Sequence, residues 1–169
     1  MMIVLTQILL RYLVVQKILN QNQLELELGN ALFGLIVLST VLIAAAGYII
    51  NDYFDVKTDT INHPDTVVVD RVIGRRWAII LHITFTIVGI ILGMYASLKT
   101  GYLRLAVFHI VAAILLWFYS THLKKRLLIG NVVVSLLTAS VAFMPLVFEM
   151  GVMQKTRPGF IFENSFTML

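Results

Sequence analysis

Residues 31–50 read ALFGLIVLSTVLIAAAGYII, a run of twenty residues without a charged side chain. About 20 apolar residues in a helix span the hydrocarbon core of a bilayer, so this run predicts a transmembrane helix. Small residues at 44–47 favour close contact with a neighbouring helix. The rest of the chain has the same character, because 59% of its 169 residues are hydrophobic and only 13% are charged. This composition predicts an integral membrane protein and excludes disordered, coiled-coil and disulfide-stapled secreted chains.

Four other apolar segments predict further transmembrane helices, at 1–19, 77–98, 105–123 and about 127–148. The first segment has no basic start and no small-residue cleavage site, so we interpret it as a helix rather than a signal peptide. We therefore expect an all-α fold, a polytopic membrane bundle of about five helices, in which residues 1–169 form a single membrane domain. The fifth helix is expected to end near Phe148, with Glu149 at its end.

The division of Lys and Arg between the two sides of the membrane predicts the orientation. Seven basic residues follow the second and fourth spans, whereas five lie on the other side. Because cytoplasmic loops carry an excess of Lys and Arg, we expect these two loops on the cytoplasmic side of a cell inner or plasma membrane. The seven residues are Lys57, Arg71, Arg75, Arg76, Lys124, Lys125 and Arg126.

Two histidines and one arginine are among the polar residues inside the predicted spans. His82 and His109 have no carboxylate or second histidine at ligand spacing, so we predict that they are interhelical hydrogen-bond partners. Arg11 has no partner that the sequence can assign. The chain contains no cysteine, which excludes disulfides, thiol nucleophiles and thiolate metal sites.

A polar segment follows the second span and holds five of the nine acidic residues. Its first part continues the predicted helix as NDYFDVKTD, residues 51–59, and places an amide and three carboxylates on one helix face. These residues are Asn51, Asp52, Asp55 and Asp59. Asp and Asn are common at solvated helix ends, but acidic residues at membrane depth are costly and usually functional. We therefore favour a functional cluster whose mutual repulsion a cation relieves.

The oxygen atoms of this cluster suit Mg²⁺, which usually shares its coordination with substrate phosphates. The spacing does not fit an EF-hand loop. Basic residues from both predicted cytoplasmic loops could bind the same phosphates, and the metal and the cations together would stabilise a departing diphosphate. Since the adjoining helices would accept an apolar tail, the residues predict a lipid substrate with a diphosphate head.

Two stretches resemble the UbiA family of intramembrane prenyltransferases. Residues 46–71, AGYIINDYFDVKTDTINHPDTVVVDR, resemble the family's first aspartate-rich motif, NDxxDxxxD. Residues 119–131, YSTHLKKRLLIGN, resemble the tyrosine and basic segment at the end of its fourth helix, followed by Gly130 and Asn131. Two motifs in the family's order, on the corresponding spans, make the resemblance specific. It covers about the first five of the family's nine or so helices.

The resemblance implies Mg²⁺-dependent transfer of a prenyl group from a polyprenyl diphosphate to a hydrophobic, often aromatic, acceptor within the lipid bilayer, through an allylic cation. By position, Asn51, Asp52, Asp55 and Asp59 would bind Mg²⁺ and the diphosphate, and the three aspartates would be the catalytic residues. The diphosphate would also contact Arg71, Tyr119, Lys124 and Lys125. Tyr48, Phe54 and Tyr119 are candidates for shielding the cation. No nucleic-acid partner is expected.

Two departures from the family pattern limit the expectation for this chain. Family members carry a second aspartate cluster, DxxxD, on a later helix, whereas only Glu149 and Glu163 are acidic after Asp70. The family's first helix usually begins with arginine, proline and asparagine, whereas this chain opens with MMIVLTQ. We therefore expect the N-terminal part of a prenyltransferase with half of the site, and a separate C-terminal half as a candidate partner. The alternative is a non-catalytic membrane subunit or transporter fragment that binds a divalent cation or a lipid diphosphate.

Overall fold

The protein is a bundle of long helices. The computed structural model describes residues 2–62, 68–70 and 72–156, apart from the side chains of residues 57–59, 62 and 127. Five helical stretches in these ranges are long and apolar enough to cross a membrane, which confirms the predicted all-α membrane fold. The elements are α1 (Met2–Leu9), the π-helical η1 (Leu10–Val15), α2 (Gln16–Gln21), α3 (Asn30–Asn62), α4 (Arg75–Thr100), the 3₁₀ turn η3 (Leu103–Leu105), α5 (Ala106–Thr121), the 3₁₀ turn η4 (Leu123–Lys125) and α6 (Leu127–Thr156).

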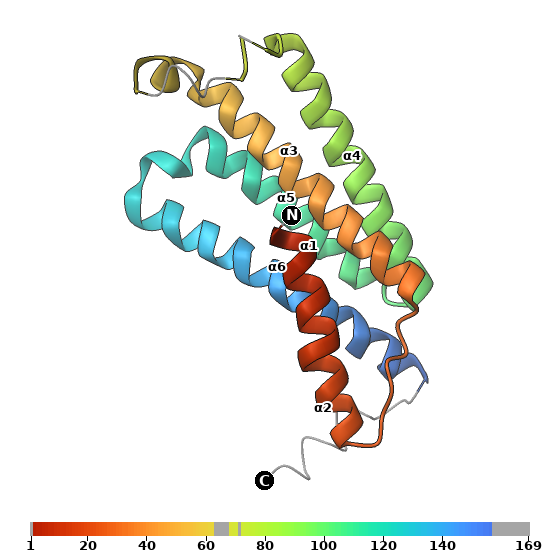
Figure 1. Ribbon diagram of the computed structural model, residues 1–169. Coiled ribbons are helices and arrows are strands. Elements are labelled where there is room, and N and C mark those ends of the chain that lie inside the picture. Colours follow the sequence, from red (N-terminus) through yellow and green to blue (C-terminus); the bar gives the residue numbers. More distant parts are fainter. Residues whose placement is uncertain (1, 63–67, 71, 157–169) are drawn as a thin grey trace.

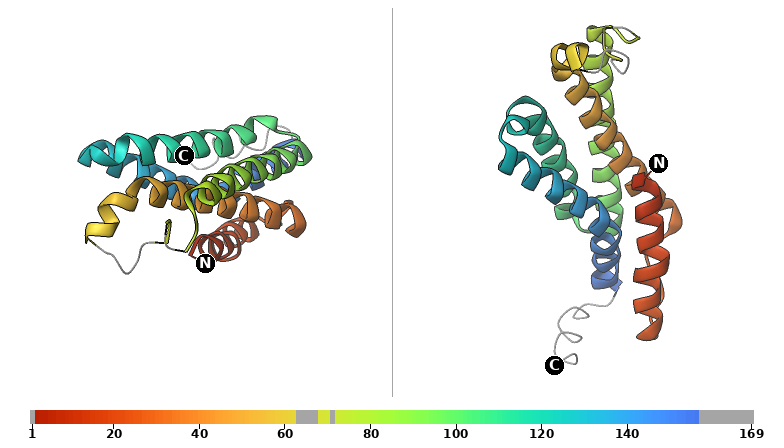
Figure 2. Two further views of the ribbon diagram at one scale, coloured as in Figure 1. Left: turned by 90° about the horizontal axis from the view of Figure 1, so that it is seen from above. Right: turned by 60° about the vertical axis from the view of Figure 1, so that its left-hand side comes forward.

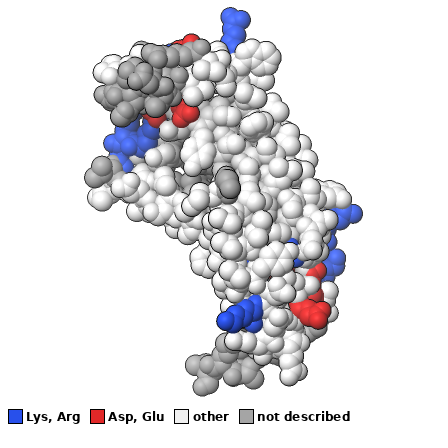
Figure 3. Space-filling view, viewed as in Figure 1, with Lys and Arg blue, Asp and Glu red and all other residues white. Residues whose placement is uncertain are grey.

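The helices form two antiparallel pairs, α3 with α4 and α5 with α6, and the continuous stretch from α1 to α2 packs beside α3 and α6 (Figures 1 and 2). The end of α3, the start of α4 and the turn between α5 and α6 lie at one end of the bundle. The connections from α2 to α3 and from α4 to α5 lie at the other end. On the face in Figure 3, charged side chains gather near these two ends and leave an uncharged belt between them. This distribution is the one that a bilayer requires.

Helix α3 carries the acidic motif beyond the apolar belt. Its 33 residues extend about 50 Å, against about 30 Å for the hydrocarbon core of a bilayer. The candidate membrane span ends at Val56, and the helix continues to Asn62. The prediction that helical geometry persists through residues 51–59 is thus confirmed, and it places the motif at the margin of the membrane.

Close contact between α3 and α4 depends on Gly89. The Ser39 hydroxyl of α3 donates a hydrogen bond of 2.6 Å to the Gly89 carbonyl. A Cβ atom on Gly89 would lie 2.7 Å from Cγ1 of Ile43 and 3.2 Å from the Ser39 carbonyl oxygen. Glycine is therefore required at this crossing because the backbones approach too closely for a side chain.

We predict that Gly89→Ala destabilises the protein by about 1–2 kcal/mol, because the new methyl group displaces α4 from α3. Gly34, in the same long helix α3, has no atom within 4 Å of the position that a Cβ atom would take, so Gly34→Ala is the matched control and should stabilise by about 0.5 kcal/mol through helix propensity. Unfolding of the two variants by sodium dodecyl sulfate in mixed micelles measures both changes. Equal effects of the two substitutions would contradict the assigned contact.

The buried Arg11 holds the segment that precedes α3. Its Nη2 donates to the Leu28 carbonyl oxygen, and its guanidinium carbon lies 4.3 Å from the centre of the Phe33 ring. The Leu28 amide donates a hydrogen bond of 3.0 Å to Oε1 of Glu149. The same oxygen accepts a hydrogen bond of 2.5 Å from the Glu27 amide. Arg11 and Glu149 are each 1% exposed. The two opposite charges thus bind one peptide segment from two sides, which gives Arg11 the partners that the sequence could not assign.

The predicted end of the fifth span at Phe148 is wrong. Helix α6 continues through Pro145 to Thr156, and Glu149 lies inside it as a buried residue. Proline is tolerated within membrane helices where neighbouring groups compensate for the missing hydrogen bond. Glu149 is therefore part of the interior of the bundle and does not mark a helix end.

The two histidines within the spans differ. Nδ1 of His82 on α4 is 2.9 Å from the Ala46 carbonyl oxygen on α3, so the prediction of an interhelical hydrogen bond is confirmed. That prediction is wrong for His109, because neither ring nitrogen has a hydrogen-bond partner of standard geometry among the described residues. Its interaction with the backbone of Leu105 stays within about one turn of the chain. The His109 ring instead packs edge-on against Phe148 at 5.9 Å.

Candidate active site

The two sequence motifs meet at one end of the bundle. Nζ of Lys124 lies 2.5 Å from Oδ1 of Asp55 and 3.5 Å from Oδ1 of Asn51. Asn51 and Asp55 are one turn apart on α3, so both side chains lie on the face that meets the turn between α5 and α6. The ion pair is partly buried, with 16% of the Lys124 side chain and 27% of the Asp55 side chain exposed. The cation expected to relieve the charge of the cluster is therefore present within this chain.

The turn that presents Lys124 depends on Gly130. Helix α5 ends at Thr121, and the 3₁₀ turn η4 carries Lys124 before α6 begins. The Arg126 amide donates to the Leu123 carbonyl, and the Gly130 amide donates to the Arg126 carbonyl. A Cβ atom on Gly130 would lie 2.9 Å from the Leu123 carbonyl oxygen, so only glycine allows α6 to pass this closely. The glycine of the second motif thus sets the position of its lysine.

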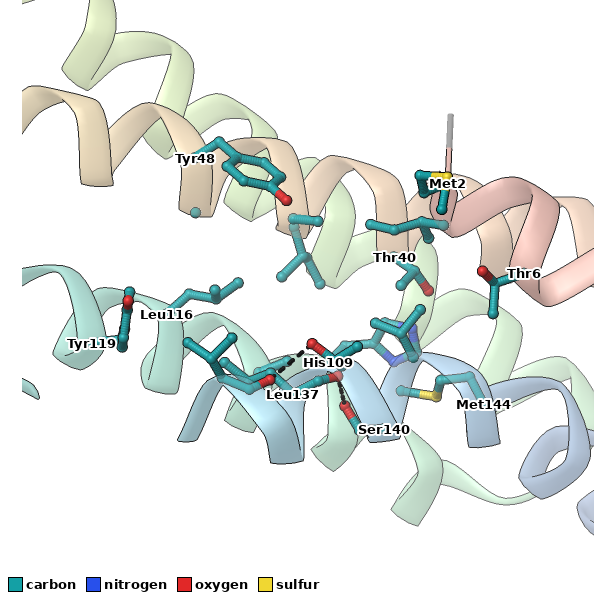
Figure 4. A pocket seen from close by; sticks show the side chains of 18 of the residues that line it. Met2, Thr6, Thr40, Tyr48, His109, Leu116, Tyr119, Leu137, Ser140 and Met144 are labelled. Carbon is teal, nitrogen blue, oxygen red and sulfur yellow. Dashed lines mark hydrogen bonds between the residues drawn. The ribbon is translucent and has the colours of Figure 1, made fainter. Parts of the chain in front are cut away.

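A cavity of about 530 Å³ leads from this polar group into the bundle, between α1, α3, α5 and α6. Such a volume is typical of sites for small organic ligands. Asn51, Tyr48 and Tyr119 lie at its polar end, and Figure 4 shows both tyrosines on the same side of the cavity. Figure 4 also places Thr6, Thr40, His109 and Met144 toward the opposite end. We call these last four residues the cavity floor. The walls between the two ends are mainly apolar, including Ile43, Leu116 and Leu137.

The residues at the polar end fit a hard divalent cation. The amide oxygen of Asn51 and a carboxylate oxygen of Asp55 converge on one cation, the Lys124 ammonium group, and oxygen ligands of these two types are those that Mg²⁺ prefers. Asp52 adds a neighbouring carboxylate that is exposed to solvent. In the described ranges, no group of three acidic or histidine side chains is arranged to hold a metal. The remaining ligands of a bound ion would then come from substrate phosphates and water.

The structure brings together only part of the predicted site. Asn51 and Tyr119 line the polar end of the cavity, and Lys124 contacts both Asn51 and Asp55. Lys125, the next residue of η4, is exposed. The side chain of Asp59 and the whole of Arg71 lie outside the described residues, so their predicted roles stay predictions.

The three candidate aromatic residues separate into two groups. Tyr48 and Tyr119 line the cavity. Phe54 does not, since its ring packs edge-on against Tyr53 at 5.3 Å and Trp117 at 6.1 Å. Two tyrosines therefore stay candidates for stabilising a cation, whereas Phe54 packs against α5.

Comparison with known proteins agrees with this geometry. The family model described as the UbiA prenyltransferase family matches residues 22–162. The chain belongs to the UbiA prenyltransferase family. The match includes the acidic motif of α3, the basic turn η4 and the four helices α3 to α6, so it covers most of the site described above.

Several curated UbiA relatives carry one name, digeranylgeranylglyceryl phosphate synthase. The protein of Ignicoccus hospitalis is 37% identical over 102 residues, which cover 60% of this chain and 32% of that protein. The protein of Methanoregula boonei is 35% identical over 119 residues, covering 67% of this chain and 39% of that protein. The protein of Saccharolobus solfataricus is 36% identical over 118 residues, which cover 70% of this chain and 39% of that protein. The chain thus spans about a third to two fifths of the length of these relatives. No solved structure matches.

Sequence reasoning on this UbiA chain missed the floor of the cavity. His109 appeared as an isolated polar residue, and Thr6, Thr40 and Met144 gave no signal. The helical spacing of small residues at Ala44 and Gly47 was the available indication, because both line the cavity. A Cβ atom on Gly47 would lie 2.9 Å from the methyl carbons of Leu116.

Proposed function

We propose that this chain forms the diphosphate-binding half of an intramembrane site that transfers a prenyl group from a polyprenyl diphosphate to a lipid acceptor. One observation carries the proposal: Lys124 meets Asn51 and Asp55 at the mouth of an apolar cavity. A prenyl diphosphate has the matching arrangement, with a multiply charged anionic head on an apolar tail. Membership of the UbiA prenyltransferase family supports the same function.

Each residue at the polar end has a distinct part in this proposal. Lys124 donates to phosphate oxygens, while Asp55 and Asn51 supply oxygen ligands to a divalent cation. When bound, Mg²⁺ neutralises charge on the departing diphosphate. The bond between the first tail carbon and the diphosphate oxygen breaks, and its electron pair leaves with the diphosphate. That carbon then bonds to the acceptor, which loses a proton.

The apolar cavity protects the electrophilic end of the tail. Its walls of α3, α5 and α6 exclude water, which would otherwise capture the allylic cation. Tyr48 and Tyr119 lie at the same end and present aromatic faces that favour a positive charge. Transfer to an acceptor is then faster than hydrolysis.

The relatives indicate the class of acceptor. Their name describes a product in which a glyceryl phosphate carries geranylgeranyl groups. We propose an acceptor of the same class, a prenylated glyceryl phosphate, in place of the aromatic acceptor that the family resemblance alone suggests. We also propose that residues 1–169 belong to one membrane domain, that the metal is Mg²⁺, and that the basic turn η4 faces the cytoplasm.

The test is formation of prenylated glyceryl phosphate and pyrophosphate by the purified chain in lipid nanodiscs, alone and with a separately expressed membrane segment carrying a DxxxD cluster. We predict that product forms with Mg²⁺ and that removal of the metal by EDTA reduces the rate at least 100-fold. Restoration by added Mg²⁺ is the control. Metal-dependent binding of geranylgeranyl diphosphate without turnover under either condition would favour the non-catalytic subunit, and absence of binding would contradict both functions.

A further inference from the structure

The cavity floor differs chemically from the rest of the cavity. His109 is 1% exposed, and neither of its ring nitrogens has a hydrogen-bond partner of standard geometry among the described residues. The side-chain amide nitrogen of Gln7 donates a hydrogen bond of 3.4 Å to the Thr40 hydroxyl and one of 3.1 Å to the Val141 carbonyl oxygen. The amide oxygen of Gln7, Oε1, has no hydrogen-bond partner among the described residues. The apolar walls therefore end at polar side chains that include His109 and Thr40, and the buried Gln7 is hydrogen-bonded to Thr40.

Tight packing fixes the position of the His109 ring. The ring lies between α4 and the cavity, and a Cβ atom on Gly93 would be 2.5 Å from its Cγ atom. On another side the ring packs edge-on against Phe148 of α6. Phe148 is fully buried. With α4 on one side and Phe148 on another, the ring forms an end wall of the cavity.

The distance from the polar end to this wall can be estimated from helix geometry. Thr40 and Asn51 are eleven residues apart on α3, about 16 Å along the helix axis, and Asp55 lies about 6 Å further. His109 and Tyr119 are ten residues apart on α5, about 15 Å. An extended isoprenoid tail adds four carbon–carbon bonds per unit, about 5 Å. A tail that starts between Asn51 and Asp55 thus reaches the wall after three to four units.

We propose that His109 sets the maximum length of the isoprenoid tail that the cavity accepts, at about four isoprene units, or twenty carbon atoms. This inference rests on the proposed function, because it assumes that the diphosphate head binds at Asp55 and Lys124. A tail of up to four units stops before the floor. A longer tail collides with the His109 ring, which α4 and Phe148 hold in place.

The experiment measures binding of prenyl diphosphates with two, three, four, six and eight isoprene units to the full chain in lipid nanodiscs with Mg²⁺. Each competes against radiolabelled geranylgeranyl diphosphate, so no turnover is needed. We expect similar dissociation constants for three and four units and at least tenfold weaker binding for six and eight. Equal affinity for four and six units would overturn the inference while leaving the proposed function intact. Absence of binding at every length would overturn the proposed function and this inference with it.

Two substitutions are expected to shift the maximum tail length in opposite directions. His109→Ala removes the wall and should improve the affinity for six units, relative to four, at least fivefold. Gly93→Ala pushes the ring into the cavity and should weaken the affinity for four units, relative to three, at least threefold. Ile110→Ala changes the next residue of α5, which is exposed on the outer surface, and should leave the length profile unchanged. An unchanged profile in His109→Ala would overturn the role of the ring, and if that variant does not fold, the wild-type series and Gly93→Ala decide.

Discussion

Replacement of Asp55 by asparagine is expected to reduce the proposed prenyl transfer by about 10²- to 10³-fold, the range seen when one preorganised group that stabilises transition-state charge is removed. The side chain keeps its size but loses the charge that attracts both Lys124 and a divalent cation. Its present partner at 2.5 Å is the Lys124 ammonium group, so this carboxylate already faces a positive charge. The rate of pyrophosphate release at saturating Mg²⁺ measures the effect.

Asp70→Asn is the matched control for this prediction. Asp70 is an exposed carboxylate of the same polar segment, and it pairs with Arg75 at 2.6 Å, away from the cavity. Removing its charge should change the rate less than about twofold, since exposed ion pairs contribute little. Similar losses in the two variants would mean that the net charge of the segment matters and that Asp55 has no specific role. A variant of Asp55 with wild-type turnover would contradict the proposed metal and diphosphate site.

Those parts of the fold that depend on periodicity and length could be predicted from the sequence. Residues 31–50 identify α3 because an uncharged run of this length has no other stable arrangement in lipid. The continuation of α3 through Asp55 also follows from the sequence, because nothing between Ile50 and Asp55 interrupts a helix. The end of α6 did not follow, since Pro145 and Glu149 resemble the end of a helix when tertiary contacts are unknown.

For the site, the sequence predicts the residues of the two motifs but not the contacts between them. Each motif gives residue types with a known chemistry, and the order of the spans places both at one end of the bundle. The pairing of Lys124 with Asp55 joins two residues that are 69 positions apart in the sequence, so it depends on how the helices pack. Likewise, His109 becomes the end of a cavity only when α4, α5 and α6 pack together. Contacts between helices that are distant in sequence therefore account for what the sequence did not predict.

The buried Glu149 is expected to contribute strongly to the stability of the fold. Its Oε1 accepts hydrogen bonds from the amides of Glu27 and Leu28, at 2.5 and 3.0 Å. These amides belong to the segment before α3, whose Leu28 side chain is 1% exposed and packs in the main hydrophobic core. Without the carboxylate, at least one buried amide loses its acceptor.

We therefore expect Glu149→Ala to lower the free energy of unfolding by about 3 kcal/mol, since hydrogen bonds to a charged acceptor contribute about 1.5–3 kcal/mol each. Glu149→Gln keeps one carbonyl acceptor and should cost about half as much. Glu25, an exposed residue of the same loop, provides the control, because Glu25→Ala should change stability by less than about 0.5 kcal/mol. Unfolding by sodium dodecyl sulfate in mixed micelles measures all three variants. Equal stability of Glu149→Ala and Glu25→Ala would mean that water replaces the carboxylate at the Leu28 amide, and that the interior of the bundle is hydrated at this point.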